Sequence, residues 1–168
     1  TLSLHDALPI SASTFEVVVW GVRLPRVLLA LVAGAGLAIC GVLMQALFRN
    51  PLADPALIGV SAGAGLGAVS VIVLGTTWLS GVNQILGIWT LPVAAFGGAL
   101  GTATIVFRLA SRDGQIDPTT MLLCGIAINA LMGAAIGLLT FVATDEQLRN
   151  LTFWTLGSLG SASWTLLV

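Results

Sequence analysis

Long apolar runs alternate with short polar connections along the chain, and this pattern predicts membrane-spanning helices. The first uncharged run, 27–48, would form a helix about 33 Å long, enough to cross a hydrocarbon core of about 30 Å. A second uncharged stretch, from Pro55 to Phe107, is too long for one crossing and is interrupted by polar and glycine residues at 81–84. The pattern therefore predicts spans near 27–48, 57–78, 85–107 and 121–143, followed by a short helix and the start of a further span at 147–168.

Composition supports an all-α, polytopic membrane protein in a lipid bilayer. Of the 168 residues, 57% are hydrophobic and only 8% are charged, against roughly 25% charged in an average soluble domain. All six basic residues are arginine, so neither a P-loop lysine nor a Schiff-base lysine is available. A net charge of -1 without a basic cluster argues against nucleic-acid binding, which requires cations to displace phosphate counterions.

The sequence offers few groups for bond chemistry. Cys40 and Cys124 lie in separate apolar runs and His5 is the lone histidine, whereas a closed zinc site needs about four ligands. The predicted spans contain no Asp, Glu, His or Lys. We therefore expect no metal site, no cofactor and no enzymatic activity in this chain.

The two ends of the chain differ from the pattern between them. Residues 1–10 are neither an amphipathic helix nor a signal peptide, and they look like a translated sequencing-adapter junction. We expect a non-native or disordered tail there and leave it out of the fold. The other end stops within an apolar run at Val168, so 11–168 is expected to be a partial transmembrane domain and the chain a fragment.

Glycines are concentrated inside the predicted spans and recur at helical spacing. Small residues four positions apart leave one helix face bare, so that another helix backbone can approach closely. This favours a tightly packed bundle but indicates no cargo. The glycines expected at helix packing faces are Gly59, Gly63, Gly67, Gly97, Gly101, Gly125, Gly133 and Gly137.

Asn129 lies on the glycine-bearing face of its span, one turn from Gly125 and one turn from Gly133. A polar side chain inside a membrane usually faces a partner or a wet cavity, because burying it unpaired is costly. Two interpretations stay open, a hydrogen bond between helices or a position on a translocation path.

Two connections carry most of the remaining polar signal. The first is RLPR, residues 23–26, in which a proline stands at a position suited to a helix start. The second is RNPLADP, residues 49–55, whose two prolines prevent a continuous helix and predict a rigid hairpin between two spans. The arginines divide equally between the two membrane faces, so their distribution does not orient the chain.

These two connections belong to a collinear block, residues 23–68, that resembles the FecCD family of permeases. Its text reads RLPRVLLALVAGAGLAICGVLMQALFRNPLADPALIGVSAGAGLGA. These permeases are the membrane subunits of type II ABC importers for iron–siderophores, haem and cobalamin. The similarity continues through LLCGIAINAL at 122–131, DEQLRNLTFW at 145–154 and GSLGSASW at 157–164.

The resemblance implies a ten-helix subunit in the bacterial inner membrane, paired with a second permease in a homo- or heterodimer around a pore. It also implies separate ABC ATPase subunits and a periplasmic or lipoprotein substrate-binding protein. The helices that couple the permease to the ATPase would lie after Val168. The cargo stays open among siderophore, haem and cobalamin.

The resemblance also assigns roles to individual residues. Arg23 and Arg26 match arginines that dock the binding protein, although they could instead mark only the boundary of a span. Asn129 lies on the helix that resembles the pore-lining one. The positions that match the cytoplasmic gate are Asn50, Leu52, Pro118 and Thr119.

The sequence thus predicts a permease subunit that forms part of a translocation path driven by separate ATPases. One alternative of another class is a small helical membrane scaffold or assembly protein, in which the glycine faces drive association without transport.

Overall fold

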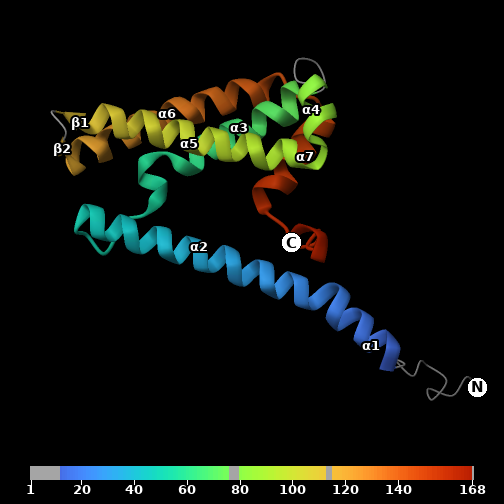
Figure 1. Cartoon of the computed structure of the whole chain (residues 1–168). Coiled ribbons are helices and arrows are strands. Elements are labelled where there is room, and N and C mark those ends of the chain that lie inside the picture. Colours follow the sequence, from blue (N-terminus) through green and yellow to red (C-terminus); the bar gives the residue numbers. More distant parts are fainter. Residues whose placement is uncertain (1–11, 76–79, 113–114, 168) are drawn as a thin grey trace, which may run out of the picture. The chain divides into compact units, whose positions relative to one another are not determined.

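The computed structural model describes residues 12–75, 80–112 and 115–167, and its elements are almost entirely helical (Figure 1). The described residues fall into two compact units. The first comprises the residues up to Ile39 together with those from Gly157 onward, and the second comprises Cys40–Leu156. The tail expected at 1–10 lies outside the described residues.

The first unit brings the beginning of the described chain together with its end. Helix α1 (Ala12–Val18) passes through a π-helical turn, Val19–Arg23, into the long helix α2 (Leu24–Phe48). The short helix α8 (Trp164–Leu167) completes this unit.

A missing backbone donor explains how the two segments of the first unit are joined. The N–H of Leu24 donates to the carbonyl of Val19, and Pro25 has no N–H to donate. The carbonyl of Trp20 therefore lacks the partner that a continuing helix would supply. The indole Nε1 of Trp164 donates to this carbonyl at 2.9 Å. Pro25, the second residue of α2, thus leaves the carbonyl of Trp20 available to bind the segment that contains Trp164.

The second unit is built on three helices that lie side by side in Figure 1, α3 (Val60–Leu74), α5 (Thr90–Ala110) and α6 (Pro118–Phe141). The connection from α5 to α6 is short and contains an antiparallel pair of two-residue strands, with Ser111 opposite Ile116. The remaining elements are the 3-10 helix η2 (Pro55–Ile58), α4 (Ser80–Leu86), the 3-10 helix η3 (Gly87–Trp89), β1 (Ser111–Arg112), β2 (Gln115–Ile116) and α7 (Asp145–Leu156).

Two apolar clusters form the interior of this unit. The larger joins the end of α2, the following loop and η2 to α5 and α6, and the smaller joins α3 to α7. The buried members of the larger cluster are Met44, Ala53, Ile58, Val106, Ala110 and Met121, and those of the smaller are Val69, Val73 and Leu151.

Three helices in the described part of the chain are long and apolar enough to cross a membrane, Phe15–Phe48, Gln84–Ala110 and Pro118–Phe141. The prediction of an all-α polytopic membrane protein is therefore confirmed. Most side chains on these helices are not buried within the chain, as expected for surfaces that meet lipid or further helices.

Helix α3 differs from its predicted span of 57–78, because it has 15 residues and is about 22 Å long. The residues just before α3 explain why it begins later than predicted. Pro55 begins a separate 3-10 turn capped by Asp54, and Gly59 adopts φ +83°, in the left-handed region that favours glycine and ends a helix. Residues 76–79, between α3 and α4, lie outside the described part of the chain.

Bare backbone at glycine lets α3 and α5 approach each other. A Cβ added to Gly63 would overlap the carbonyl oxygen of Gly98 and the side chain of Thr102, and one added to Gly98 would overlap the carbonyl of Gly63. One turn further along α3, a Cβ on Gly67 would overlap the carbonyl of Ala94. Two of the predicted packing glycines thus lie in the crossing itself, and Gly98 was not among those predicted.

The other predicted packing glycines divide into two groups. A Cβ on Gly125 would overlap the carbonyl of Leu57, and one on Gly59 would lie 2.8 Å from Cγ2 of Thr102. At the remaining four, a Cβ would meet nothing within 4 Å in the described chain, so any close neighbour must come from elsewhere. These four are Gly97, Gly101, Gly133 and Gly137.

Candidate functional site

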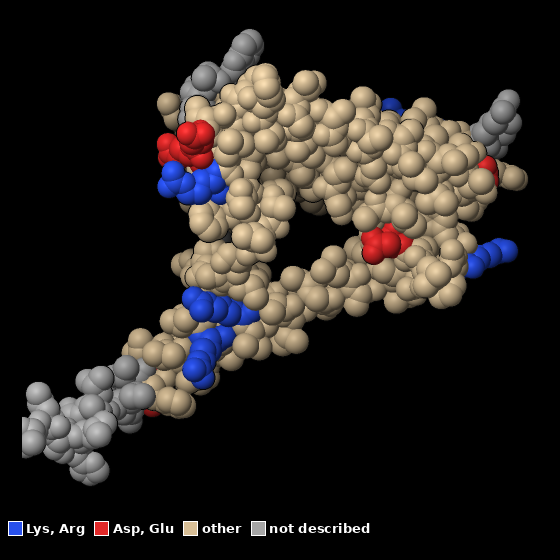
Figure 2. Space-filling model, turned by 180° about the vertical axis from the view of Figure 1, so that it is seen from behind, with Lys and Arg blue, Asp and Glu red and all other residues tan. Residues whose placement is uncertain are grey.

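The arginines expected to dock a partner lie at the start of α2. Arg23 ends the π-helical turn and Arg26 lies in the first turn of α2, and both are exposed, while Pro25 between them is buried. Nη2 of Arg26 donates to the carbonyl of Gly160 at 3.4 Å. Charged side chains are sparse on the face drawn in Figure 2, where basic groups stand out near the N-terminal end of the described chain.

The loop after α2 is shaped by Asn50. Helix α2 ends at Phe48, Arg49 adopts φ 49°, and the N–H of Asn50 then donates to the carbonyl of Gln45 at 3.1 Å. Oδ1 of Asn50 accepts from the N–H of Leu52 at 3.0 Å, and its carbonyl accepts from the N–H of Ala53 at 3.1 Å. These bonds fix a tight turn, as the sequence predicts for asparagine at this position.

Asp54 continues this ordered backbone into η2. Its Oδ1 accepts from the N–H of Ala56 at 2.6 Å, and its carbonyl accepts from the N–H of Leu57 at 3.0 Å. Ala53 is buried, whereas the side chain of Leu52 is 85% exposed. The loop is thus held by its own hydrogen bonds while one apolar side chain projects from it.

The second predicted gate element is the capped start of α6. Oδ1 of Asp117 accepts from the N–H of Thr119 at 3.2 Å, and Oδ2 accepts from the N–H and the hydroxyl of Thr120. The hydroxyl of Thr120, followed by these backbone donors, holds the pKa of Asp117 below its usual value of 3.8. Because the pKa is lower in the folded state, this cap stabilises fully above the usual value and is lost as pH falls through the lowered one.

One cavity of about 230 Å³ joins the two gate elements. Asn50 lines it from the loop, and Pro118 and Thr119 line it from the start of α6, although these segments are far apart in the sequence. Leu52 is not among the lining residues. The cavity is completed by Phe48, Ala53, Leu57 and Leu122.

Asn129 is half-buried on α6 and bonds to the segment that follows the loop. Its Nδ2 donates to the carbonyl of Ala56 at 3.0 Å. Of the two interpretations left open by the sequence, this contact corresponds to a hydrogen bond between elements. No signal in the sequence around Asn129 indicated which backbone group it would meet.

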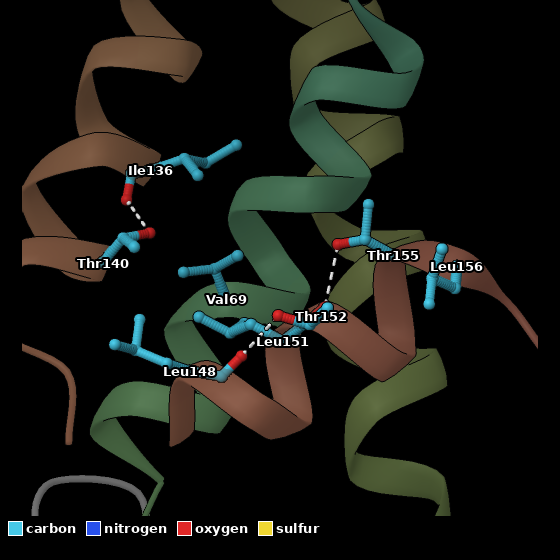
Figure 3. A pocket seen from close by; sticks show the side chains of 8 residues that line it. All are labelled: Val69, Ile136, Thr140, Leu148, Leu151, Thr152, Thr155 and Leu156. Atoms are coloured by element: carbon cyan, nitrogen blue, oxygen red, sulfur yellow. Dashed lines mark hydrogen bonds between the residues drawn. The ribbon is translucent and has the colours of Figure 1, made fainter. Parts of the chain in front are cut away.

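A larger cavity, of about 560 Å³, lies between α3, α6 and α7, and no sequence motif indicated it (Figure 3). Three threonines line it, but each hydroxyl donates to the carbonyl four residues earlier on its own helix. Their donors are therefore already used within the helices. The lining residues are Val69, Ile136, Thr140, Leu148, Leu151, Thr152, Thr155 and Leu156.

The connection into α7 positions one wall of this cavity. The N–H of Thr144 donates to Oε1 of Gln147 at 2.9 Å, and the N–H of Gln147 lies 3.4 Å from Oγ1 of Thr144, which is a capping box. Nε2 of Gln147 also donates to the carbonyl of Val73 at 3.1 Å, which ties α7 to the end of α3. The Thr-x-x-Gln pattern at 144–147 is a capping-box signature that is visible in the sequence.

The family model of the FecCD transport family matches residues 2–168, which include both polar loops and the helices between them. The chain belongs to the FecCD transport family. This confirms the resemblance stated for residues 23–68, and it places this multi-pass membrane protein in a family of transport proteins.

Curated relatives of this FecCD chain are permease proteins of two transport systems. The hemin transport system permease protein HmuU of Yersinia pestis is 48% identical over 151 residues, covering 89% of this chain and 44% of the relative. The cobalamin import system permease protein BtuC of Halobacterium salinarum is 39% identical over 151 residues, covering 90% of this chain and 38% of the relative. The chain thus spans less than half the length of these relatives.

A solved structure has the same arrangement of helices. It is described as an inward-facing conformation of a putative metal-chelate type ABC transporter, and it matches this FecCD chain with a TM-score of 0.77 and 31% identity. The match covers 96% of this chain and 48% of the other. The fold is therefore that of part of an ABC transporter permease.

Proposed function

We propose that this chain is part of the permease subunit of an ABC importer and forms part of its translocation path. The observation that carries the proposal is the family match over residues 2–168, which includes both the RLPR and RNPLADP loops. In this proposal the chain catalyses no bond chemistry, and separate ATPase subunits hydrolyse ATP. The protein would lie in the bacterial inner membrane beside a second permease subunit.

Asn50, Leu52, Pro118 and Thr119 form the cytoplasmic gate in this proposal. Support comes from the cavity that Asn50 shares with Pro118 and Thr119, because two separate loops converge there. The loop backbone is held in place, which suits a gate that moves as a unit. Leu52 projects from it, 85% exposed, and would meet the second permease subunit across the pore.

Arg23 and Arg26 dock the substrate-binding protein in this proposal. Both are exposed at the start of α2, and the RNPLADP loop at 49–55, here called the gate loop, follows the end of the same 25-residue helix. Exposed ion pairs add little affinity singly, but they steer encounter and fix orientation. A docking site and a gate at opposite ends of one helix suit a path that opens alternately to the two sides.

We propose a metal chelate as the cargo, and a metal–tetrapyrrole in preference to an iron–siderophore. The names of the relatives support this class, since HmuU is a hemin permease protein and BtuC a cobalamin permease protein. The relative named for hemin has the higher identity of these two, which makes haem the first cargo to test.

Uptake by cells that lack their own haem and cobalamin permeases tests this proposal. The full-length protein is expressed with its ATPase and binding protein, and accumulation of haemin, cyanocobalamin and ferric enterobactin is measured. We expect accumulation of a tetrapyrrole that is lost when the ATPase subunit is made inactive. If the complex assembles and none of the three accumulates, the importer assignment is wrong and the scaffold alternative is favoured.

A further inference from the structure

The segment that follows the gate loop is fastened to helix α6. Nδ2 of Asn129 donates to the carbonyl of Ala56 at 3.0 Å, across 73 positions of sequence. One turn earlier on α6, a Cβ on Gly125 would overlap the carbonyl of Leu57, so the helix backbone lies directly against η2. Two neighbouring peptide groups of η2 therefore meet the same face of α6.

Asn129 contacts η2 close to Gly59, where the backbone changes direction between η2 and α3. The carbonyl of Ala56 also accepts from the N–H of Gly59 at 3.1 Å, so it has two donors. Gly59 adopts φ +83° and separates η2 from α3, and a Cβ built on it would lie 3.5 Å from Oδ1 of Asn129. The Asn129 side chain is thus placed at the point where the loop and η2 would turn relative to α3.

This contact differs in kind from the hydroxyl hydrogen bonds within α3, α5 and α6. Oγ of Ser70, Oγ1 of Thr102 and Oγ1 of Thr140 each donate to the carbonyl four residues earlier in the same helix. Such bonds lie within one helix and do not connect it to another. The bond from Asn129 instead joins two elements that lie far apart in the sequence.

Apolar packing around η2 leaves the same segment little room to move alone. Ile58 is buried in a cluster with Met121 of α6 and Met44 of α2. Ala53, in the gate loop itself, is buried in that cluster as well. The loop and η2 therefore share an interior with the first half of α6.

We propose that Asn129 is a positioning residue of the gate, whose side-chain amide fixes the RNPLADP loop and η2 to α6 so that they move as one body. This inference rests on the proposed function, because it assigns a role within the same gate. Packed elements tend to move as rigid bodies with bending confined to a few residues. The bond to Ala56 excludes Gly59 as the bending point, and the gate opens when α6 itself moves.

Distances between spin labels in the full-length transporter, assembled with its ATPase, test this proposal. The background lacks Cys40 and Cys124, and labels are placed through Leu52→Cys on the loop and Leu123→Cys on α6, both exposed positions. Labelled protein is diluted with unlabelled protein, so that only distances within one subunit are measured. We expect one narrow distance that is the same without nucleotide and with ATP and vanadate.

Three substitutions separate positioning from general stability. Asn129→Leu removes the donor and should replace the narrow distance with a broad distribution, while Asn129→Gln keeps an amide donor and should restore a narrow one. Thr104→Val removes a hydroxyl that bonds only to Leu100 in its own helix, and it should leave the distance unchanged. The basal rate of hydrolysis of Mg-ATP is recorded for each variant to confirm assembly.

Two results would overturn the inference. One is a distance in the unsubstituted protein that changes with ATP, a result that does not depend on any Asn129 variant folding. The other is a distribution in Asn129→Leu that matches the unsubstituted protein. Either leaves the proposed function intact if chelate uptake is retained, whereas loss of uptake by the unsubstituted protein would contradict the proposed function itself.

Discussion

Reversing two charges, Arg23→Glu together with Arg26→Glu, is expected to weaken docking of the substrate-binding protein to the full-length transporter at least tenfold at low salt. Both side chains are exposed at the start of α2. Each reversal replaces an attraction to an acidic partner with a repulsion, and about 1.4 kcal/mol corresponds to a tenfold change in affinity. The dissociation constant is measured with the transporter in nanodiscs, at low and at high ionic strength.

Arg108→Glu is the matched control for this experiment. It reverses a single arginine, which is half the charge change of the double variant, at an exposed position in the last turn of α5. We expect it to leave docking unchanged, and we expect salt to reduce the difference between the double variant and the unsubstituted protein. Unchanged affinity of the double variant at low salt would remove Arg23 and Arg26 from the docking surface.

Gly98→Ala is expected to destabilise the protein strongly, because a Cβ there overlaps the carbonyl of Gly63 at the crossing of α3 and α5. Forcing extra atoms into a packed interior typically costs about 1–3 kcal/mol. The atoms that this Cβ would meet are backbone atoms of Gly63 and Gly67, so no side chain can rotate away to relieve the overlap. The midpoint of thermal unfolding of the full-length protein in detergent is measured by the loss of monodisperse material.

The adjacent glycine provides the control. A Cβ on Gly97 meets nothing within 4 Å in the described chain, so Gly97→Ala should change the unfolding midpoint little, or raise it slightly through higher helix propensity. The two variants add the same methyl group at neighbouring positions of one helix. Equal midpoints for both would contradict the close approach of α3 and α5.

Local chemistry visible in the sequence accounts for most helix ends. The span predicted at 121–143 lies close to α6, which begins at Pro118 after its Asp117 cap. The span predicted at 85–107 corresponds to the candidate span Gln84–Ala110, and within it a 3-10 turn with Gly87 at φ 52° precedes α5. A conformation of this kind is allowed by glycine but is not dictated by it, so the sequence alone left it open.

Which glycines lie in a helix crossing could not be read from spacing alone. Gly63 and Gly67 contact α5 as their spacing suggests, but the glycine of α5 in this crossing is Gly98, one residue from the predicted Gly97. Neighbouring positions on a helix differ by about 100° in direction, and the direction of the partner helix depends on contacts distant in the sequence. The Asn129 bond to Ala56 is hidden for the same reason, because 73 residues separate the two groups.

The proposed function requires the two ends of α2 to lie on opposite faces of the membrane, with the docking arginines outside and the gate loop inside. Labelling of single cysteines tests this most directly. In a full-length protein that lacks Cys40 and Cys124, Arg26→Cys and Leu52→Cys are each exposed to a membrane-impermeant maleimide in spheroplasts. We predict labelling at 26 in intact spheroplasts and labelling at 52 only after permeabilisation. Labelling of both from the same side, or the reverse pattern, would contradict the account.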